Sequence, residues 1–310
     1  KLKNIRGYLM SYSAVGYLYP KKPFDFSKSL RFLDSFTPGK NEQQVKENLL
    51  VKGVQVGNQN FVFSIFSIGS VEKPKLKYEL CSNKYFGKKV QKNVEEKIGF
   101  YLSTDDDLTE FYNIGEEDKY FEPIIENLYG YHQVKFFSAF ENACWAVMST
   151  RTPMNLAKKM KKDFSEKYGA YLQYNNEFYL SFPDAKNIKE ISEEEVIEVV
   201  GNRKKGEYLK NVIDFFAQDD NQYLEKENYD EVKKKLLDIK GIGEWSASFI
   251  LLRSLGFMED NPTKEKVLKN KVNDLYKNCD IKSEEIANSY GNYVGYWAHY
   301  IRAYESVRGK

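Results

Sequence analysis

The feature that most constrains this 310-residue chain is a pair of closely spaced glycines between two helical patterns. Apolar residues recur at helical spacing over residues 230–239, and a second apolar helical pattern covers residues 244–255. Gly241 and Gly243 separate the two patterns, with Ile242 between them. Glycine adopts left-handed backbone angles without strain, so this spacing predicts a tight turn with Ile242 inserted into the core. The sequence therefore predicts two helices joined by a short hairpin.

The start of the second predicted helix is suited to binding an anion. The first backbone N–H groups of a helix lack intrahelical partners and carry partial positive charge. Glycines leave the backbone accessible, so a phosphate can approach it closely. We therefore predict DNA-phosphate contacts at Gly241, Gly243, Glu244 and Ser246. The alternative is an ordinary helix–turn–helix corner with a C-cap glycine, but the apolar pattern on both sides of the turn favours DNA binding.

The composition restricts how such a chain can bind DNA. The formal net charge is only +2, so binding must come from a local patch. The 42% of hydrophobic residues is typical of a globular protein, and aromatic residues reach 15%, which supplies rings for stacking on bases. The three scattered cysteines are too few for a disulfide framework, a zinc site or an iron–sulfur cluster, so we expect an intracellular protein with reduced thiols. The longest apolar run, residues 61–68, is too short to span a membrane.

Two parts of the chain differ in their patterns. Residues 1–103 contain mostly strand patterns, including a pair around a turn at Gly57, and a helical pattern at residues 25–36. Residues 104–310 have helical patterns throughout and contain the hairpin at residues 230–254. The sequence thus predicts an N-terminal α+β domain followed by a helical body. The predicted linkers are residues 88–103 and 218–228.

Several stretches, in order along the chain, resemble one protein family. The hairpin at residues 241–247 and the predicted central helix at residues 137–148 are similar to those of the 3-methyladenine DNA glycosylase II branch of the helix-hairpin-helix glycosylases. Residues 291–297 look more like the 8-oxoguanine glycosylases. The chain is thus identified as a member of the helix-hairpin-helix (HhH-GPD) DNA glycosylase superfamily. Further matching stretches are residues 23–33, 105–112 and 201–209.

The resemblance implies a fold and an activity. The fold is of the α+β class, with an N-terminal domain similar to half of a TATA-box-binding protein and a two-lobed, all-α body. The activity is base-excision repair, in which an alkylated or oxidised purine is flipped out and its N-glycosidic bond is cut. The expected partner is double-stranded DNA with a damaged base. The protein is expected to be a monomer and to have no membrane partner. No organic cofactor is implied, but the family carries a structural monovalent cation on the backbone carbonyls matching Leu237, Ile239 and Ile242.

The catalytic position departs from the family pattern. Breaking the glycosidic bond builds positive charge on the sugar, which a carboxylate can stabilise. In the family, an Asp supplies this carboxylate shortly after a proline that follows the hairpin. An ungapped match places Lys264 there, where a cation would oppose the developing charge. The hairpin also lacks the lysine of bifunctional relatives, because Trp245 occupies that position.

Three alternatives follow from Lys264. The first is a catalytically inactive relative that binds DNA or a lesion. In the second, Glu265 or Asp260 supplies the carboxylate through a shifted loop. In the third, Lys264 is itself a nucleophile that forms a Schiff base with the sugar.

The base pocket is predicted from aromatic residues. Trp245 and Phe249 are one helical turn apart and therefore share a face, which suits a slot for a flipped base. Tyr296 and Trp297 are further candidates for this pocket. The alternative is that all four are core residues of the helical body.

Three positively charged residues are relevant to DNA and base binding. Arg151 occupies the position where relatives place the residue that fills the gap left by the flipped base, although a surface role before Pro153 is the alternative. Lys204 is predicted to contact a phosphate. In the final helix, Ala298 and Arg302 replace the glutamine and aromatic residue of the 8-oxoguanine enzymes, which argues against simple transfer of their specificity.

Overall fold

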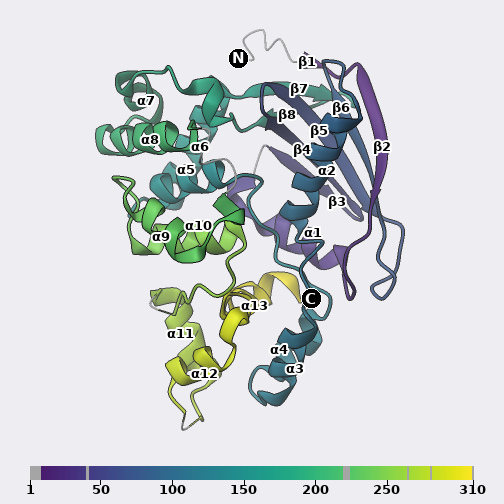
Figure 1. Ribbon diagram of the computed structural model, residues 1–310, viewed down its shortest axis with the longest axis vertical. Helices are drawn as coiled ribbons and strands as arrows, with labels where there is room; N and C mark the ends of the chain where they lie inside the picture. Colours follow the sequence, from purple (N-terminus) through teal and green to yellow (C-terminus); the bar gives the residue numbers. More distant parts are fainter. Residues whose placement is uncertain (1–7, 40–41, 219–223, 264, 280, 309–310) are drawn as a thin grey trace.

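A five-stranded antiparallel sheet forms much of the N-terminal part of the molecule (Figure 1). The computed structural model describes residues 8–39, 42–218, 224–263, 265–279 and 281–308. The predicted turn at Gly57 joins two neighbouring strands and has a φ of 59°. In spatial order the strands are β2 (Tyr12–Leu18), β6 (Leu76–Ser82), β5 (Gln59–Ser67), β4 (Leu49–Val56) and β3 (Gln43–Lys46).

Two helices accompany this sheet. Helix α1 (Phe26–Ser35) confirms the predicted helix and begins at Asp25, whose carboxylate accepts the N–H of Ser27. The linker predicted at residues 88–103 is wrong, because helix α2 (Lys88–Leu102) occupies that segment. Its buried side, which includes Ile98 and Tyr101, packs into the main core, while its lysine-rich side faces solvent.

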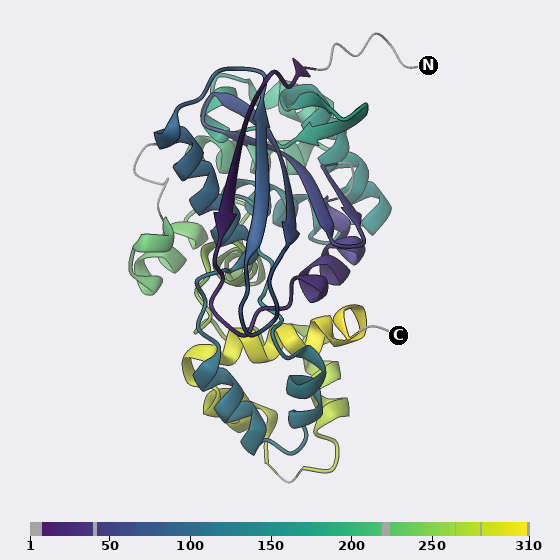
Figure 2. The same cartoon turned by 90° about the vertical axis from the view of Figure 1, so that its right-hand side faces the viewer.

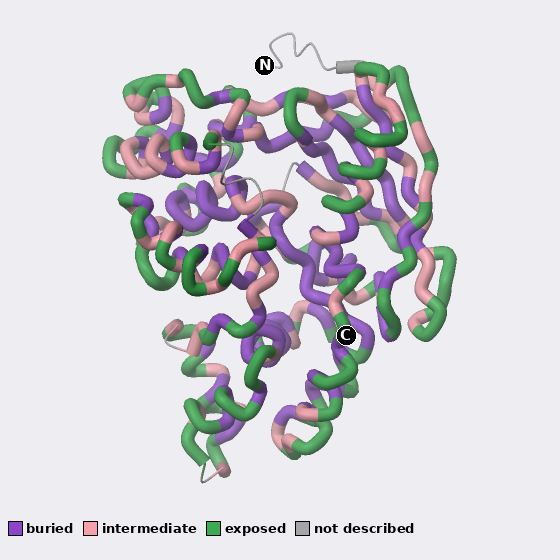
Figure 3. The backbone as a smooth tube through the Cα atoms, in the orientation of Figure 1, coloured by how far each residue is buried: buried purple, intermediate pink, exposed green. Residues whose placement is uncertain are grey.

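Most of the remaining chain forms two groups of helices (Figure 1). One group surrounds α5, which is buried along almost its whole length (Figure 3). It comprises α5 (Ala139–Ser149), α6 (Met154–Tyr168), α7 (Glu193–Val200), α8 (Arg203–Phe216), α9 (Tyr229–Leu237), α10 (Glu244–Ile250) and the π-helical segment η5 (Leu251–Leu255). The other comprises α3 (Thr109–Glu117), α4 (Glu122–Leu128), α11 (Lys266–Leu275), α12 (Ser283–Ser289) and α13 (Val294–Val307).

The expectation of an all-α body is wrong. Strands β7 (Ala170–Tyr174) and β8 (Glu177–Ser181) form a hairpin within it. The turn residues Asn175 and Asn176 both have positive φ angles, as asparagines in tight hairpins do. Strand β1 (Tyr8–Leu9) pairs in parallel with β7. This small sheet therefore combines one strand from the predicted N-terminal domain with two strands from the predicted body.

A buried ionic cluster links the sheet to the helices. Lys161 of α6 donates to Glu42, which precedes β3, at 2.5 Å and to Glu141 of α5 at 2.9 Å. Lys52 of β4 lies 3.4 Å from Glu42. All four side chains are buried. The cluster therefore fixes α5 and α6 against the five-stranded sheet.

The last helix lies close to the first. Figure 2 shows α13 crossing below the end of the sheet next to α1, and both helices contribute to one hydrophobic core. The cysteines Cys81, Cys144 and Cys279 are all free thiols. Among the helices that the structure describes, none combines the length and apolar character needed to cross a bilayer.

Candidate active site

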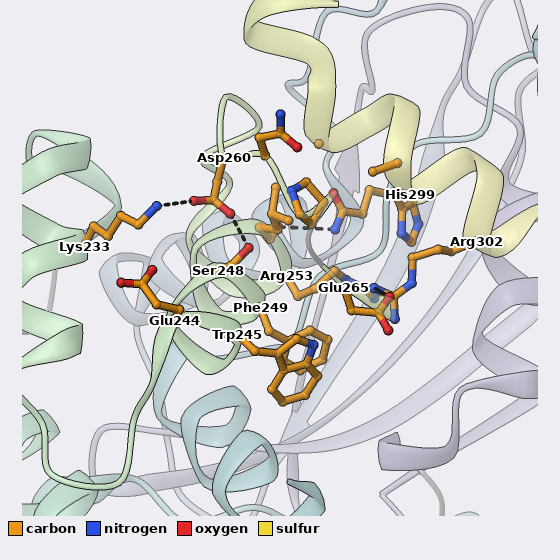
Figure 4. Close-up of a pocket in the computed structure, with 16 residues that line it drawn as sticks. Lys233, Glu244, Trp245, Ser248, Phe249, Arg253, Asp260, Glu265, His299 and Arg302 are labelled. Atoms are coloured by element: carbon orange, nitrogen blue, oxygen red, sulfur yellow. Dashed lines mark hydrogen bonds and ion pairs between the residues drawn. The ribbon is translucent and has the colours of Figure 1, made fainter. Parts of the chain in front are cut away.

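A pocket of about 290 Å³ lies between the second hairpin helix and the last helix (Figure 4). Helices α10 and α13 and the segment that leads into α11 supply most of its wall. The lining residues that matter below are Gln133, Trp245, Ser248, Phe249, Arg253, Asp260, Glu265, His299 and Arg302.

A flat aromatic surface forms one side of this pocket. The rings of Trp245 and Phe249 are parallel within 8°, with their centroids 5.3 Å apart. Trp245 remains 39% exposed, so its ring is accessible to a planar ligand. Helical spacing within α10 places both rings on one face, as the sequence predicts.

The carboxylate of Glu265 lines the same pocket (Figure 4). Glu265 is the N-cap of α11 and accepts the N–H groups of Val267 at 2.9 Å and Leu268 at 3.0 Å. Its side chain also lies 3.3 Å from the guanidinium of Arg302 on α13. These contacts hold an acidic group, 13% exposed, at the edge of the cavity.

Asp260 also lines the pocket but is occupied by other contacts. It is 1% exposed, and its Oδ1 accepts the hydroxyl of Tyr229 at 2.6 Å and the ammonium of Lys233 at 3.0 Å. Its Oδ2 accepts the hydroxyl of Ser248. Burial and the Asp260 carboxylate raise the pKa of Tyr229 to about 12, so this phenol stays protonated as a donor. Asp260 therefore fastens the segment that carries Glu265 to α9 and α10.

The other predicted residues divide between the core and the undescribed part of the chain. Lys264 lies outside the described residues. Tyr296 donates to Asp106, and the indole N–H of Trp297 donates to Tyr276 at 3.0 Å, so both are core residues that do not line this pocket. The face of α13 that borders the cavity carries Gly295, Ala298, His299 and Arg302 instead.

The sequence-based prediction missed Arg253 and Gln133. Arg253 follows Trp245 and Phe249 at successive four-residue steps, and this spacing was the available signal. Its guanidinium stacks 5.0 Å from the Phe32 ring centroid and donates to the carbonyl of Val134 at 2.8 Å. Burial, together with nearby Arg302, lowers the pKa of Arg253 to about 10.

Gln133 comes from a non-regular segment far from the hairpin in the sequence. It is fully buried, and its Nε2 donates to the carbonyl of Leu252 at 3.2 Å. Nearby His299 lies 2.9 Å from the hydroxyl of Tyr131 through its Nε2. Burial and the adjacent Arg253 and Arg302 hold the pKa of His299 well below its usual value, so this imidazole is neutral.

The hairpin itself has the predicted backbone. Gly241 has a φ of 109°, and a Cβ there would lie 2.4 Å from the Tyr208 ring. Ile242 is buried, as predicted. Gly243 caps α10 with extended backbone angles, and a Cβ there would meet nothing within 4 Å. Glu244 is exposed and Ser246 is buried, so any anion contact at Ser246 is limited to its backbone N–H.

Lys204 and Arg151, which are predicted to contact DNA, are both exposed. Lys204 is exposed and lies 5.7 Å from the ring centroid of Tyr208, the residue that packs on Gly241. Arg151 is exposed after α5 and has a φ of 53°, a left-handed conformation that is uncommon outside glycine. The ammonium of Lys205 supports this turn by donating to the carbonyls of Val147 and Thr150.

The sequence and the fold are similar to those of known proteins. No protein-family model matches the sequence. A DNA-3-methyladenine glycosylase of Bacillus subtilis is 25% identical over 242 residues, which cover 76% of this chain and 77% of that protein. The fold is similar to that of a 3-methyladenine DNA-glycosylase from Archaeoglobus fulgidus, with a TM-score of 0.77, 18% identity and coverage of 94% of this chain and 98% of that one.

A second solved structure has a similar fold. It is a Clostridium acetobutylicum 8-oxoguanine glycosylase/lyase in complex with double-stranded DNA, with a TM-score of 0.66, 19% identity and coverage of 94% of this chain and 98% of that one. The chain is therefore similar in sequence to a DNA-3-methyladenine glycosylase and shares the fold of both solved glycosylase structures.

Proposed function

We propose that this protein is a DNA N-glycosylase of base-excision repair. The observation that carries the proposal is a single pocket, next to the hairpin, that combines the accessible Trp245 ring with the Glu265 carboxylate. A flipped base needs a flat apolar surface, and cleavage of its bond to the sugar needs a nearby negative charge. The pocket supplies both.

Glu265 is the proposed catalytic carboxylate. As the glycosidic bond breaks, its electrons leave with the base nitrogen, and the carboxylate stabilises the positive charge that develops on the sugar. A water molecule adds its oxygen to C1′, and the proton that it releases ends on the departing base. In this proposal Asp260 is a positioning residue, because its three donors hold the segment that leads to Glu265.

Duplex DNA is the proposed partner of the exposed hairpin. The first N–H groups of α10, at Gly243 and Glu244, would bind a backbone phosphate, with Lys204 adding a positive charge nearby. Arg151 would enter the gap left by the extruded base. We also propose that the N-terminal sheet and its helices resemble half of a TATA-box-binding protein. The protein is further proposed to act as a monomer.

A monovalent cation at the hairpin is a further part of the proposal. The last carbonyls of a helix lack helical donors, and Leu237 ends α9. The carbonyl of Ile239 accepts the N–H of Ile242 at 2.9 Å, which leaves its second lone pair available. These carbonyls and that of Ile242 would hold the cation and stabilise the turn. Replacing small cations in the buffer with tetramethylammonium should then weaken duplex binding.

An excision assay tests the enzyme against the inactive alternative. Duplexes carrying alkylated purines, deaminated bases or 8-oxoguanine are incubated with the wild type, Glu265→Gln and Lys264→Asp. We expect the wild type to excise at least one lesion and Glu265→Gln to be about 100-fold slower in single turnover, with duplex binding retained. Glutamine keeps an oxygen that can cap α11.

Other outcomes separate the alternatives that the sequence left open. Excision only by Lys264→Asp would show that the wild type is an inactive relative. A covalent adduct trapped by borohydride in the wild type, and lost in Lys264→Met, would instead establish a lysine nucleophile.

A further inference from the structure

Two polar groups in the pocket wall have unused hydrogen-bonding capacity. Gln133 is fully buried, and its Oε1 has no hydrogen-bond partner among the residues that the structure describes. The Nε of Arg253 is likewise buried and, within the same described segments, unpartnered. Buried polar atoms are normally satisfied, so a pair of exceptions on one cavity indicates a ligand that completes them. Both side chains line the pocket that contains Trp245.

The charges around the pocket leave Arg253 uncompensated. The Glu265 carboxylate pairs with Arg302, and Asp260 pairs with Lys233. Glu244 lies at an exposed position of the lining. No carboxylate of the described residues lies within ion-pair distance of Arg253, whose neighbours are aromatic rings and a carbonyl. A cationic base in this pocket would therefore face a fixed positive charge without a partner.

We propose that the pocket selects uncharged purines with a lactam edge, which Arg253 and Gln133 read, and discriminates against cationic alkylated bases. A lactam places a carbonyl acceptor next to an N–H donor. The carbonyl suits the N–H of Arg253, and the N–H suits the Oε1 of Gln133. This inference rests on the glycosylase function proposed above, and it names the chemical class of its substrate.

Hypoxanthine and 8-oxoguanine belong to this class. Guanine has the same edge at N1 and O6, but base pairing occupies that edge in a duplex, and extrusion is easiest for mismatched or damaged bases. In 8-oxoguanine, N7–H and O8 provide a second lactam that guanine lacks. The stacked rings of Trp245 and Phe249 accept any flat base, so they do not discriminate.

Four lesions separate the effect of charge from that of the lactam. Hypoxanthine is neutral and has the lactam, whereas 7-methylguanine has the lactam but is cationic. Ethenoadenine is neutral without the lactam, and 3-methyladenine is cationic without it. Each excision rate is divided by the spontaneous rate of the same lesion, because cationic bases depart readily without an enzyme. We expect the acceleration for hypoxanthine to exceed each of the other three about tenfold or more.

Two variants, each with a matched control, test whether Arg253 and Gln133 cause the preference among these lesions. Arg253→Met should reduce the preference for hypoxanthine over 7-methylguanine. Arg308→Met, at the exposed arginine that caps the end of the last helix, should leave this preference unchanged. Gln133→Leu should reduce the preference for hypoxanthine over ethenoadenine. Asn142→Leu is its control, because Asn142 is also fully buried and bonded to a backbone carbonyl but does not line the pocket.

The outcomes distinguish this inference from the function on which it rests. Excision with equal or greater acceleration for the cationic lesions would overturn the inference and leave the glycosylase function standing. Excision of no lesion would overturn the glycosylase function. If Arg253→Met does not fold in thermal denaturation, the wild-type lesion series and Gln133→Leu still decide the matter. Binding to uncleavable 2′-fluoro duplexes with hypoxanthine or ethenoadenine should show the same order as excision.

Discussion

At the scale of single residues, two nearby carboxylates have different surroundings and therefore different proposed roles. Asp260 is buried and accepts three side-chain donors, whereas Glu265 caps a helix and keeps an edge on the pocket. The sequence offered both residues as candidates but could not separate them. Their partners come from α9, α10 and α13, and such tertiary contacts are absent from a linear pattern.

The different roles of Asp260 and Glu265 should appear in the free energy of unfolding of variants at these two positions. Asp260→Asn leaves the Lys233 ammonium without its carboxylate, so we expect the free energy of unfolding to fall by about 3 kcal/mol. Glu265→Gln changes one helix cap, and a loss of about 1 kcal/mol is expected. Urea denaturation of both variants checks this order. A larger loss for Glu265→Gln would reverse the assignment of the structural role.

The neutral imidazole of His299 makes stability depend on pH. Its pKa is held well below 6.5 by burial and nearby arginines, so the unfolded chain binds a proton first as the pH falls. The stability that the neutral His299 contributes is therefore present above the pKa of this histidine in the unfolded chain. It is lost as the pH falls below that pKa, by at most about 1.4 kcal/mol per pH unit. We expect His299→Phe to have a shallower decline in unfolding free energy between pH 7 and pH 5. The decline should be compared with that of the wild type, and parallel curves would contradict the assignment.

At the scale of elements, the sequence predicted the hairpin, α1 and the β4–β5 turn, because strong local patterns define them. It missed α2, whose many lysines obscure a narrow apolar face, and the β7–β8 hairpin, whose short strands follow a long helix. The Asn175-Asn176 pair was a local signal for that turn.

The start of α10 can be tested separately from the fold of the hairpin. Gly243 has ordinary backbone angles and open space, so Gly243→Glu should fold normally while a bulky anion blocks the phosphate site. We expect duplex affinity to fall about tenfold or more, with a shallower salt dependence. Gly87→Glu is the control, since Gly87 also caps a helix with extended angles and open space. Equal affinity of the two variants would remove the hairpin from the DNA interface.

At the scale of the whole molecule, the sheet and the helices are joined by the buried cluster around Lys161. Lys161→Met leaves Glu42 and Glu141 buried without their shared cation, so we expect a loss of about 3–5 kcal/mol in unfolding free energy. Lys159→Met, on the same helix, removes only a pair whose lysine is 69% exposed, and its effect should be below about 1 kcal/mol. Calorimetry of both variants measures the difference. Similar melting temperatures would show that the cluster adds little to the junction.

The pocket, too, is a property of the whole molecule. Trp245 and Phe249 were predictable from their spacing, but Gln133 and the α13 face were not, because the three segments meet only in the folded chain. Helix α13 supplies one wall of the pocket and packs in the same core as α1. During synthesis, the hairpin leaves the ribosome before α13 does. A nascent chain can therefore form the proposed phosphate-binding hairpin before the pocket is complete. The proposed excision then becomes possible only when the last helix packs against the first.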